Sequence, residues 1–191
     1  MLHKFGIADK SFFTMPASDN KLIFVAFRLI HAILLCSIAL FLYCTTLLAP
    51  VSAQEIKPLT PSKKDKCPVC GMFVYKYPDW TAQIIFKDGT VVFFDGVKDM
   101  VKYYLNMNKY APLRKVSDIL ALFVNDYYSL KPIDAKKAFY VIGSDVYGPM
   151  GKELIPFAKE AEAKEFMKDH KGVKILTFQG ITAETLKSLE E

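Results

Sequence analysis

The sequence predicts an α+β fold of two ββαβ units, with helices packed on mainly antiparallel sheet and an N-terminal hydrophobic signal or anchor helix in front of them. Three features support this fold class. An uncharged apolar run occupies residues 29–48, and a hairpin signal is centred on Asp88-Gly89. From residue 81 onward the order strand, strand, helix, strand occurs twice, which predicts two similar halves of one domain.

We expect three parts along the chain. Residues 1–53 would form a cytoplasmic tail with a signal peptide or membrane anchor, and residues 54–66 a linker. The folded domain is expected over residues 67–191, with halves at about 67–130 and 131–181. The part that follows residue 53 is long enough to bury a core of its own.

The apolar run 29–48 is long enough to cross a bilayer, since twenty residues of helix rise about 30 Å. Basic residues precede it and predict a cytoplasmic N-terminus: Lys4, Lys10, Lys21 and Arg28. Val51-Ser52-Ala53 resembles a signal-peptidase site, which would make Gln54 the first mature residue. The run is longer than a usual signal-peptide core, so a retained anchor is the alternative. Both alternatives place residues 54–191 outside the cytoplasm.

Cys36 and Cys44 lie inside the apolar run and are expected to act as small hydrophobic residues. A lipidated cysteine normally follows a small residue, whereas Leu35 and Tyr43 precede these two. We therefore expect no lipid anchor at either position.

In the first half, residues 81–86 and 91–94 are β-branched, apolar and joined through Asp-Gly, which predicts a hairpin. Asp95 is a candidate cap for the helix that follows. That helix would bury residues at the spacing i, i+3, i+4, i+7, i+8, and a strand is expected over 119–127. The buried helical positions are Val97, Met100, Val101, Tyr104 and Leu105.

In the second half, strands are expected over 138–142 and 153–155. Pro156 is typical of a first helical position, and the helix would run to about Asp169 and end before Gly172. One face of this helix would hold Ala163, Phe166, Met167 and His170. A strand over 173–178 and a short helix capped by Thr182 complete the prediction.

Composition excludes several classes of function. The formal charge of +5 is dispersed along the chain, which does not favour nucleic-acid binding. After residue 53 the sequence has one histidine, His170, and no glycine-rich phosphate loop. No pair of carboxylates and no Ser/His/Asp set has a catalytic spacing, so we do not expect an enzyme.

The chemistry of the chain is concentrated in Cys67-Pro68-Val69-Cys70-Gly71-Met72. A structural zinc site would need two further Cys or His ligands, and only His170 is available in the exported part. A reactive dithiol would need a lowered thiol pKa, commonly from a helix N-terminus, but extended residues follow Cys70. An inert disulfide would close a very small loop, where the stabilisation is least. All three alternatives remain open.

Copper(I) is the fourth interpretation and the one that the residues favour, because soft thiolate and thioether donors select this ion. Met72 distinguishes it, since its thioether would add nothing to a zinc site or a dithiol, although it could also pack in a core. A second candidate, Met150, lies between glycines in Gly148-Pro149-Met150-Gly151, where there is little core to fill. Met100, Met107 and Met167 lie in or beside helical patterns and are expected to pack, and His170 is expected to be a cap or surface residue.

Several motifs together resemble the NosL family, the nitrous-oxide reductase accessory proteins, over about residues 65–181. The resemblance rests on the motif at 67–72 combined with Gly148-Pro149-Met150-Gly151. Between and after them come Phe94-Asp95, Asp126-Tyr127-Tyr128, Ile133-Asp134-Ala135, Ala138 to Ser144, Pro156-Phe157, Ala163, Phe166 and His170.

The resemblance implies a periplasmic, membrane-associated copper(I) chaperone, Cu(I) being its cargo, that helps to build the copper–sulfur centre of nitrous-oxide reductase. The partner would be the reductase or its membrane maturation complex. The soft-donor positions of the family correspond here to Cys70, Met72 and Met150, with Cys67 as a further candidate. The chain departs from the family in two ways: it lacks a good lipidation site, and His170-Lys171-Gly172 stands where His-Gly-Gly is usual. The alternative functions are a periplasmic thiol–disulfide oxidoreductase and an adaptor domain with a static disulfide.

Overall fold

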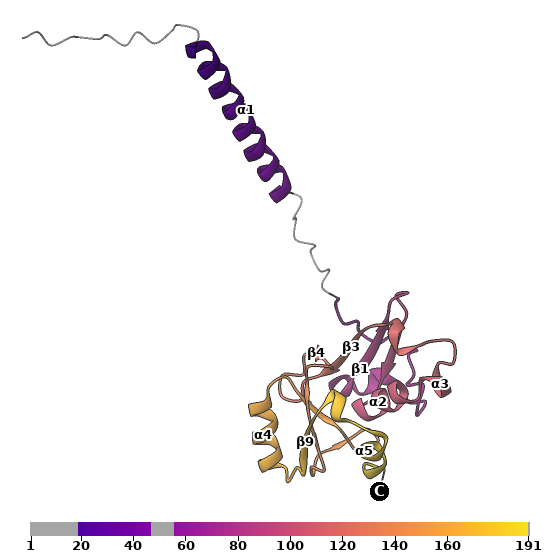
Figure 1. Cartoon of the computed structure of the whole chain (residues 1–191). Helices are drawn as coiled ribbons and strands as arrows, with labels where there is room; N and C mark the ends of the chain where they lie inside the picture. Colours follow the sequence, from indigo (N-terminus) through magenta and orange to yellow (C-terminus); the bar gives the residue numbers. More distant parts are fainter. Residues whose placement is uncertain (1–18, 47–55, 191) are drawn as a thin grey trace, which may run out of the picture. The chain divides into compact units, whose positions relative to one another are not determined.

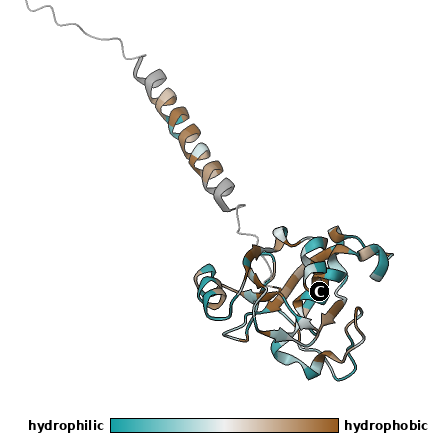
Figure 2. Cartoon of the chain, turned by 90° about the horizontal axis from the view of Figure 1, so that it is seen from below, coloured by the Kyte–Doolittle hydropathy of each residue, from teal (hydrophilic) through white to brown (hydrophobic). Residues whose placement is uncertain are grey.

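The computed structural model describes residues 19–46 and 56–190. The chain forms two compact units, Met1–Gln54 and Glu55–Glu191 (Figure 1). In the first unit, helix α1 (Asp19–Thr46) contains an apolar stretch, Phe24–Phe41, with a mean hydropathy of 2.3 and no residue buried. Figure 2 shows this apolar character along the helix. The expected N-terminal apolar helix is therefore present and is long enough to cross a membrane, while the candidate cleavage site at 51–54 lies outside the described residues.

The first half of the domain is a four-stranded antiparallel sheet in the order β2-β1-β3-β4. Strand β1 is buried along its whole length and joins β2 through the predicted Asp88-Gly89 turn, where Gly89 has a φ of +83° that favours glycine. The strands are β1 (Ala82–Phe86), β2 (Val91–Phe94), β3 (Ile119–Asn125) and β4 (Pro132–Asp134). Strand β4 pairs with β3, although its residues fall within the second predicted half.

Helix α2 (Val97–Leu105) packs on this sheet, followed by the short helix α3 (Met107–Tyr110). Three of its predicted core residues are buried, namely Val97, Met100 and Val101. Leu105 is 42% exposed, and Tyr103 is buried instead. Polar residues in the first turn are also buried, which places the start of α2 inside the domain.

The second half is a three-stranded antiparallel sheet in the order β8-β5-β9, covered by helix α4. Its elements are β5 (Phe139–Ile142), β8 (Ile155–Phe157), α4 (Glu160–Asp169) and β9 (Lys174–Thr177). A small hairpin, β6 (Tyr147–Gly148) and β7 (Gly151–Lys152), is inserted before β8. The α+β prediction with two ββαβ units is thus confirmed, with β4 and this hairpin as additions.

Pro156 does not start a helix, and that prediction is wrong. It lies within β8, and α4 begins at Glu160. Strand β8 is at the edge of its sheet, where a proline without an N–H leaves no ladder hydrogen bond unmade. Thr182 caps α5 (Ala183–Ser188) through its side chain, as predicted.

The described residues of the domain include four 3₁₀ turns in its irregular parts. The segment that precedes the cysteine motif is hydrogen-bonded to strand β1. The backbone of Leu59 exchanges two hydrogen bonds with the side chain of Gln83, at 2.9 and 3.0 Å, within the segment expected to be a linker. The turns are Val74–Lys76, Pro78–Trp80, Val116–Asp118 and Phe178–Gly180.

The two halves share a main core cluster and are joined at Asp126-Tyr127, directly after β3, while a second core cluster around Phe157 and Phe166 lies within the second half. Tyr127 donates its backbone N–H to the carbonyl of Pro156 (2.9 Å), and Asp126 accepts the N–H of Ala158 (2.7 Å). The main core cluster combines Phe86 and Met100 of the first half with buried residues of the second half, Tyr140, Leu154, Leu176 and Phe178.

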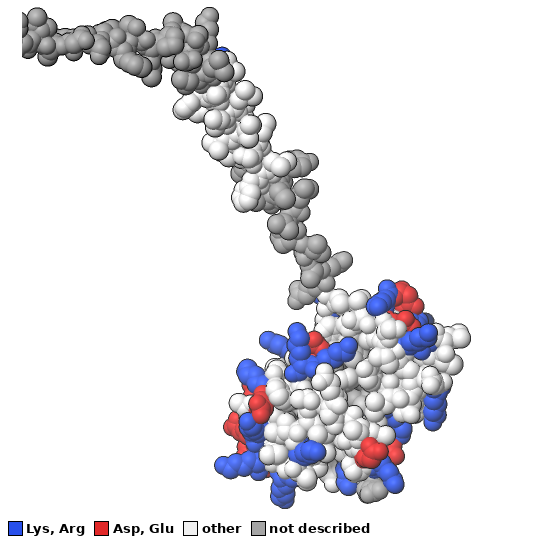
Figure 3. Space-filling model, in the orientation of Figure 1, with Lys and Arg blue, Asp and Glu red and all other residues white. Residues whose placement is uncertain are grey.

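Charges of both signs are interspersed on the face of the domain shown in Figure 3.

The join at Asp126 generates a stability prediction. Burial raises the pKa of this carboxyl, but hydrogen bonds from Ser129 and Ala158 outweigh burial and hold the pKa below its usual value. A lowered pKa stabilises the fold above about pH 4, and this stabilisation is lost as the pH falls through the lowered pKa. We expect Asp126→Asn to reduce the free energy of unfolding by about 2 kcal/mol at pH 7 and by less at pH 3.

Urea denaturation of the domain at both pH values would measure this difference. Ser129→Ala is the matched control, because it removes the hydroxyl bond to the same carboxylate (2.7 Å) together with one long bond from the Lys131 N–H (3.4 Å), and it should cost less. An Asp126→Asn penalty that does not change between pH 7 and pH 3 would contradict the assignment.

Candidate metal site

A tight loop presents Cys67 and Cys70 on one side of the backbone. Cys67 donates its N–H to the carbonyl of Met72 and accepts the N–H of Gly71, both at 2.9 Å. Gly71 has a φ of +82°, in the left-handed region, which explains a glycine at this position. Lys66 and Phe73 form a bridge that closes the ends of the loop.

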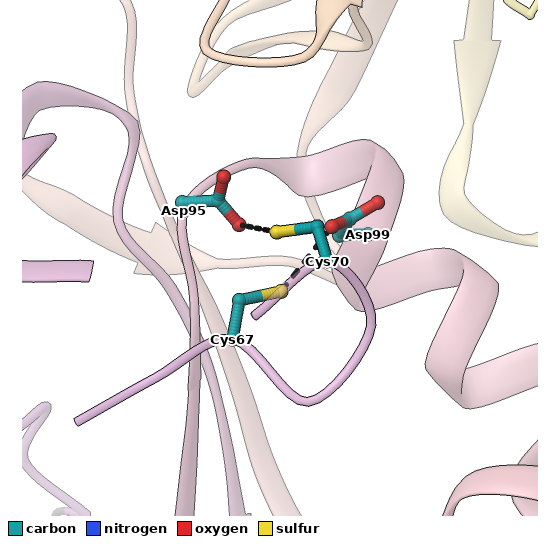
Figure 4. Close-up of side chains that lie close together, drawn as sticks. All are labelled: Cys67, Cys70, Asp95 and Asp99. Carbon is teal, nitrogen blue, oxygen red and sulfur yellow. Dashed lines mark hydrogen bonds between the residues drawn. The ribbon is translucent and has the colours of Figure 1, made fainter. Parts of the chain in front are cut away.

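Two aspartates at the start of α2 face these thiols. Asp95 immediately precedes Gly96, the N-cap residue, and Asp99 lies in the first turn of the helix. The Sγ of Cys67 donates to Asp99 Oδ2 (3.2 Å), and the Sγ of Cys70 donates to Asp95 Oδ1 (3.1 Å), as Figure 4 shows. One ligand atom from each of the four residues lies within 4.8 Å of the others. We call these four residues the Cys/Asp cluster.

The Cys/Asp cluster is largely enclosed but open at Cys70. Cys67, Asp95 and Asp99 are 1%, 1% and 5% exposed, whereas Cys70 is half-buried. The Oδ2 atom of Asp95 is buried and has no hydrogen-bond partner among the described residues. A buried polar atom without a partner costs about 1–3 kcal/mol, so this oxygen is a donor atom available to a bound cation.

Both thiols hold their protons at neutral pH. Burial raises the pKa of Cys67 far above its usual value, and burial likewise raises the pKa of Cys70 to about 12. The neighbouring carboxylates raise both pKa values further, while backbone N–H groups of the loop act in the opposite direction. Because metals bind thiolates, a metal ion entering this cluster must displace thiol protons.

The two predicted methionines lie in the cysteine loop and in a turn near α2. Met72 is half-buried and belongs to the cysteine loop. Met150 is 44% exposed in the turn between β6 and β7, and its carbonyl accepts a hydrogen bond from Lys98 Nζ (2.8 Å). Asp99 and Met150 both line a cavity of about 340 Å³. The structure thus brings Cys67 and Cys70 together and places Met150 next to α2, while the ligand roles of all four residues stay predictions.

The aspartates are what sequence reasoning missed. Asp95 was expected to cap α2, but the N-cap residue is Gly96, and the Asp95 carboxylate instead accepts a hydrogen bond from Cys70. Asp99 was not predicted as a site residue. The signal that could have identified it is its position in the first turn of a predicted helix, four residues after Asp95. His170 ends α4, stacks on Phe166 and contacts Asp145 (3.1 Å), which fits the expected structural role.

The donor set fits a thiophilic cation. Two cysteines supply soft donors suited to Cu(I) or Zn²⁺, and the carboxylates add oxygen atoms that harder ions prefer. Thioethers would shift this preference toward copper(I). The arrangement can therefore hold a metal ion and give it up through the accessible Cys70.

Comparison with known proteins identifies the family. Residues 58–186 match the model of the NosL family. Curated relatives with the name copper-binding lipoprotein NosL are 32% identical over 136 residues in Stutzerimonas stutzeri and 32% over 127 residues in Achromobacter cycloclastes. These matches span 67% and 60% of this chain, and 67% and 63% of the respective relatives.

A solved structure supports the same relationship. The crystal structure of the copper chaperone NosL from Shewanella denitrificans matches with a TM-score of 0.57 and 25% sequence identity. The match covers 67% of this chain and 97% of that protein. Sequence and structure therefore agree that this chain belongs to the NosL family.

Proposed function

We propose that this chain is a periplasmic copper(I) chaperone that delivers copper for the maturation of nitrous-oxide reductase. The observation that carries the proposal is the convergence of Cys67 and Cys70 on one partly open cluster. The copper-binding names of relatives over the same residues support it. The ligands would be Cys67, Cys70, Met72 and Met150, with Asp95 and Asp99 beside them.

The unequal burial of the two thiols suits transfer of the ion. Cys70 is accessible, so copper(I) and an exchanging partner ligand would meet it first, while the enclosed Cys67 would hold the ion from within. On binding, each thiol would lose one proton to the solvent, and the carboxylate that accepts its hydrogen bond is placed to pass that proton on. Protonation of the thiols by the same route would favour release.

Helix α1 supports the proposed location of the domain. An apolar helix near the N-terminus, long enough to cross a membrane, fits a signal sequence or a tether. Relatives are named lipoproteins, and here α1 would serve the tethering role if it is retained. The domain would then work at the periplasmic membrane surface, next to a maturation complex or the reductase.

The chemistry of the thiols disfavours a thiol–disulfide oxidoreductase. Such an enzyme needs a thiolate at neutral pH, which requires a lowered thiol pKa. Here burial and adjacent carboxylates raise the pKa of both thiols. We accordingly propose a binding protein and no enzyme.

Removing soft donors should weaken copper(I) binding. In the reduced domain, we expect the Cys70→Ser, Met72→Leu double variant to lose at least 100-fold in copper(I) affinity, since even outer-shell changes cost about 10–100-fold. Titration with copper(I) against a competing chelator under anaerobic conditions would measure this. Met167→Leu is the matched control, because Met167 packs against the second core cluster, and it should bind as the parent does. An unchanged affinity in the double variant would refute the site.

The thiols should be unreactive without metal. We expect iodoacetamide to modify Cys70 in the folded, reduced domain at least tenfold more slowly at pH 8 than in the urea-unfolded chain, because its raised pKa leaves little thiolate. Asp95→Asn should speed this reaction, since it removes a carboxylate that raises the pKa of Cys70. Mass spectrometry of timed samples gives the rates. Equal rates in the folded and unfolded chain would contradict the protonated state.

Copper(I) affinity should also depend on pH. At a pH below the raised thiol pKa values, each thiol must release one proton to bind copper(I). The apparent affinity should therefore rise with pH, by up to about tenfold per pH unit for each proton released. The chelator titration repeated between pH 6 and pH 8 would show this slope. A flat profile would mean that protonated thiols are not displaced on binding.

A further inference from the structure

Glu153 is a buried carboxyl that the proposed metal chemistry does not use. It is 3% exposed and lies between β7 and β8, three residues after Met150. Its Oε1 accepts the backbone N–H of Lys98 (2.6 Å) and that of Leu154 (2.8 Å). Lys98 is the second residue of α2, so a carboxylate from the second half satisfies the N-terminus of a helix in the first half.

Two glycines make room for this side chain. A Cβ at Gly96 would overlap the carboxylate of Glu153, and a Cβ at Gly148 would come within 3.0 Å of its Cγ. Gly96 is the N-cap of α2, next to Asp95, and Gly148 belongs to the turn that carries Met150. Glu153 therefore packs against both the start of α2 and the Met150 turn.

Lys98 forms a second link between the same elements. Its backbone N–H binds Glu153, and its Nζ donates to the carbonyl of Met150 (2.8 Å). The side chain of Lys98 is itself buried, and the residue stands between Asp95 and Asp99 in the sequence. The Met150 turn is thus fixed to the stretch of chain that supplies both carboxylates of the Cys/Asp cluster.

The burial of Glu153 is costly, which argues that its placement matters. A buried carboxyl loses hydration, and burial raises the pKa of Glu153 to about 8 in spite of the two N–H groups and the Lys98 ammonium. An apolar residue of similar size would avoid this cost but could not bind the N–H groups of α2.

We propose that Glu153 is a positioning residue that locks the Met150 turn onto the first turn of α2, so that the Met150 thioether joins the copper site formed by the first half. The inference rests on the proposed function and deepens it, because it explains how a donor from the second half is held in place. Without the lock, Met150 would sit in an exposed turn and contribute little to affinity.

A double-mutant cycle on copper(I) affinity tests this coupling, with the parent, Met150→Leu, Glu153→Ala and the double variant. In the parent background we expect Met150→Leu to weaken binding by at least about 10-fold. In the Glu153→Ala background the same change should cost less than about threefold, since Met150 no longer reaches the ion. Glu153→Gln should restore the Met150 dependence, because its amide oxygen can accept the same two N–H groups.

Two further variants separate positioning from a general loss of stability. Asp126→Asn loosens the other join between the halves and should leave the Met150 dependence unchanged. Lys98→Met removes the ammonium link to the Met150 carbonyl while keeping the backbone N–H that binds Glu153, and it should reduce that dependence, which supplies the test if Glu153→Ala does not fold. Circular dichroism and thermal unfolding would establish that each variant is folded.

The outcomes distinguish this inference from the proposed function. If the parent binds copper(I) weakly and without dependence on Cys70, the function itself is overturned. If copper(I) binding depends on Cys70 and Met72 while Met150→Leu costs nothing, the function stands and the positioning role is overturned. Equal Met150→Leu penalties with and without the Glu153 carboxyl would also overturn it.

Discussion

The start of helix α2 is the point on which the rest of the domain depends. Polar residues are buried there and meet partners from elsewhere in the chain, except for the Oδ2 atom of Asp95, which has none among the described residues. Asp95 and Asp99 accept hydrogen bonds from the two thiols of the cysteine loop, and Glu153 accepts one from a backbone N–H at the start of the helix. Polar groups buried in this way hold the surrounding loops in a single arrangement, since each broken contact would leave a buried group unsatisfied.

Under the proposed function, this constraint would explain how one site holds and releases a soft ion. The thiols are kept protonated by burial and by carboxylates, so binding must exchange protons for metal. The open side at Cys70 gives a partner access, while Cys67 stays enclosed. The site is therefore suited to exchange with a partner and poorly suited to redox turnover, in keeping with the chaperone named among its relatives.

Local signals in the sequence were sufficient for most of the fold. The Asp-Gly turn predicted the β1–β2 hairpin, and the apolar spacing from Val97 predicted α2, because both depend on neighbouring residues. Pro156 was misassigned, since its place on an edge strand is decided by which strand pairs with it. The same limit applied to the site: the cysteine loop is a local motif, but the approach of Asp99 and Glu153 depends on pairing between distant segments.

The central claim is that one copper(I) ion is held by thioethers from both halves of the domain. Methyl NMR of the reduced domain with ¹³C-labelled methionine methyl groups tests it most directly. On addition of one equivalent of copper(I), the account predicts that the methyl signals of Met72 and Met150 move together, while that of Met167 in the second core stays in place. Movement of Met72 alone, or of neither methionine, would contradict a site shared between the halves.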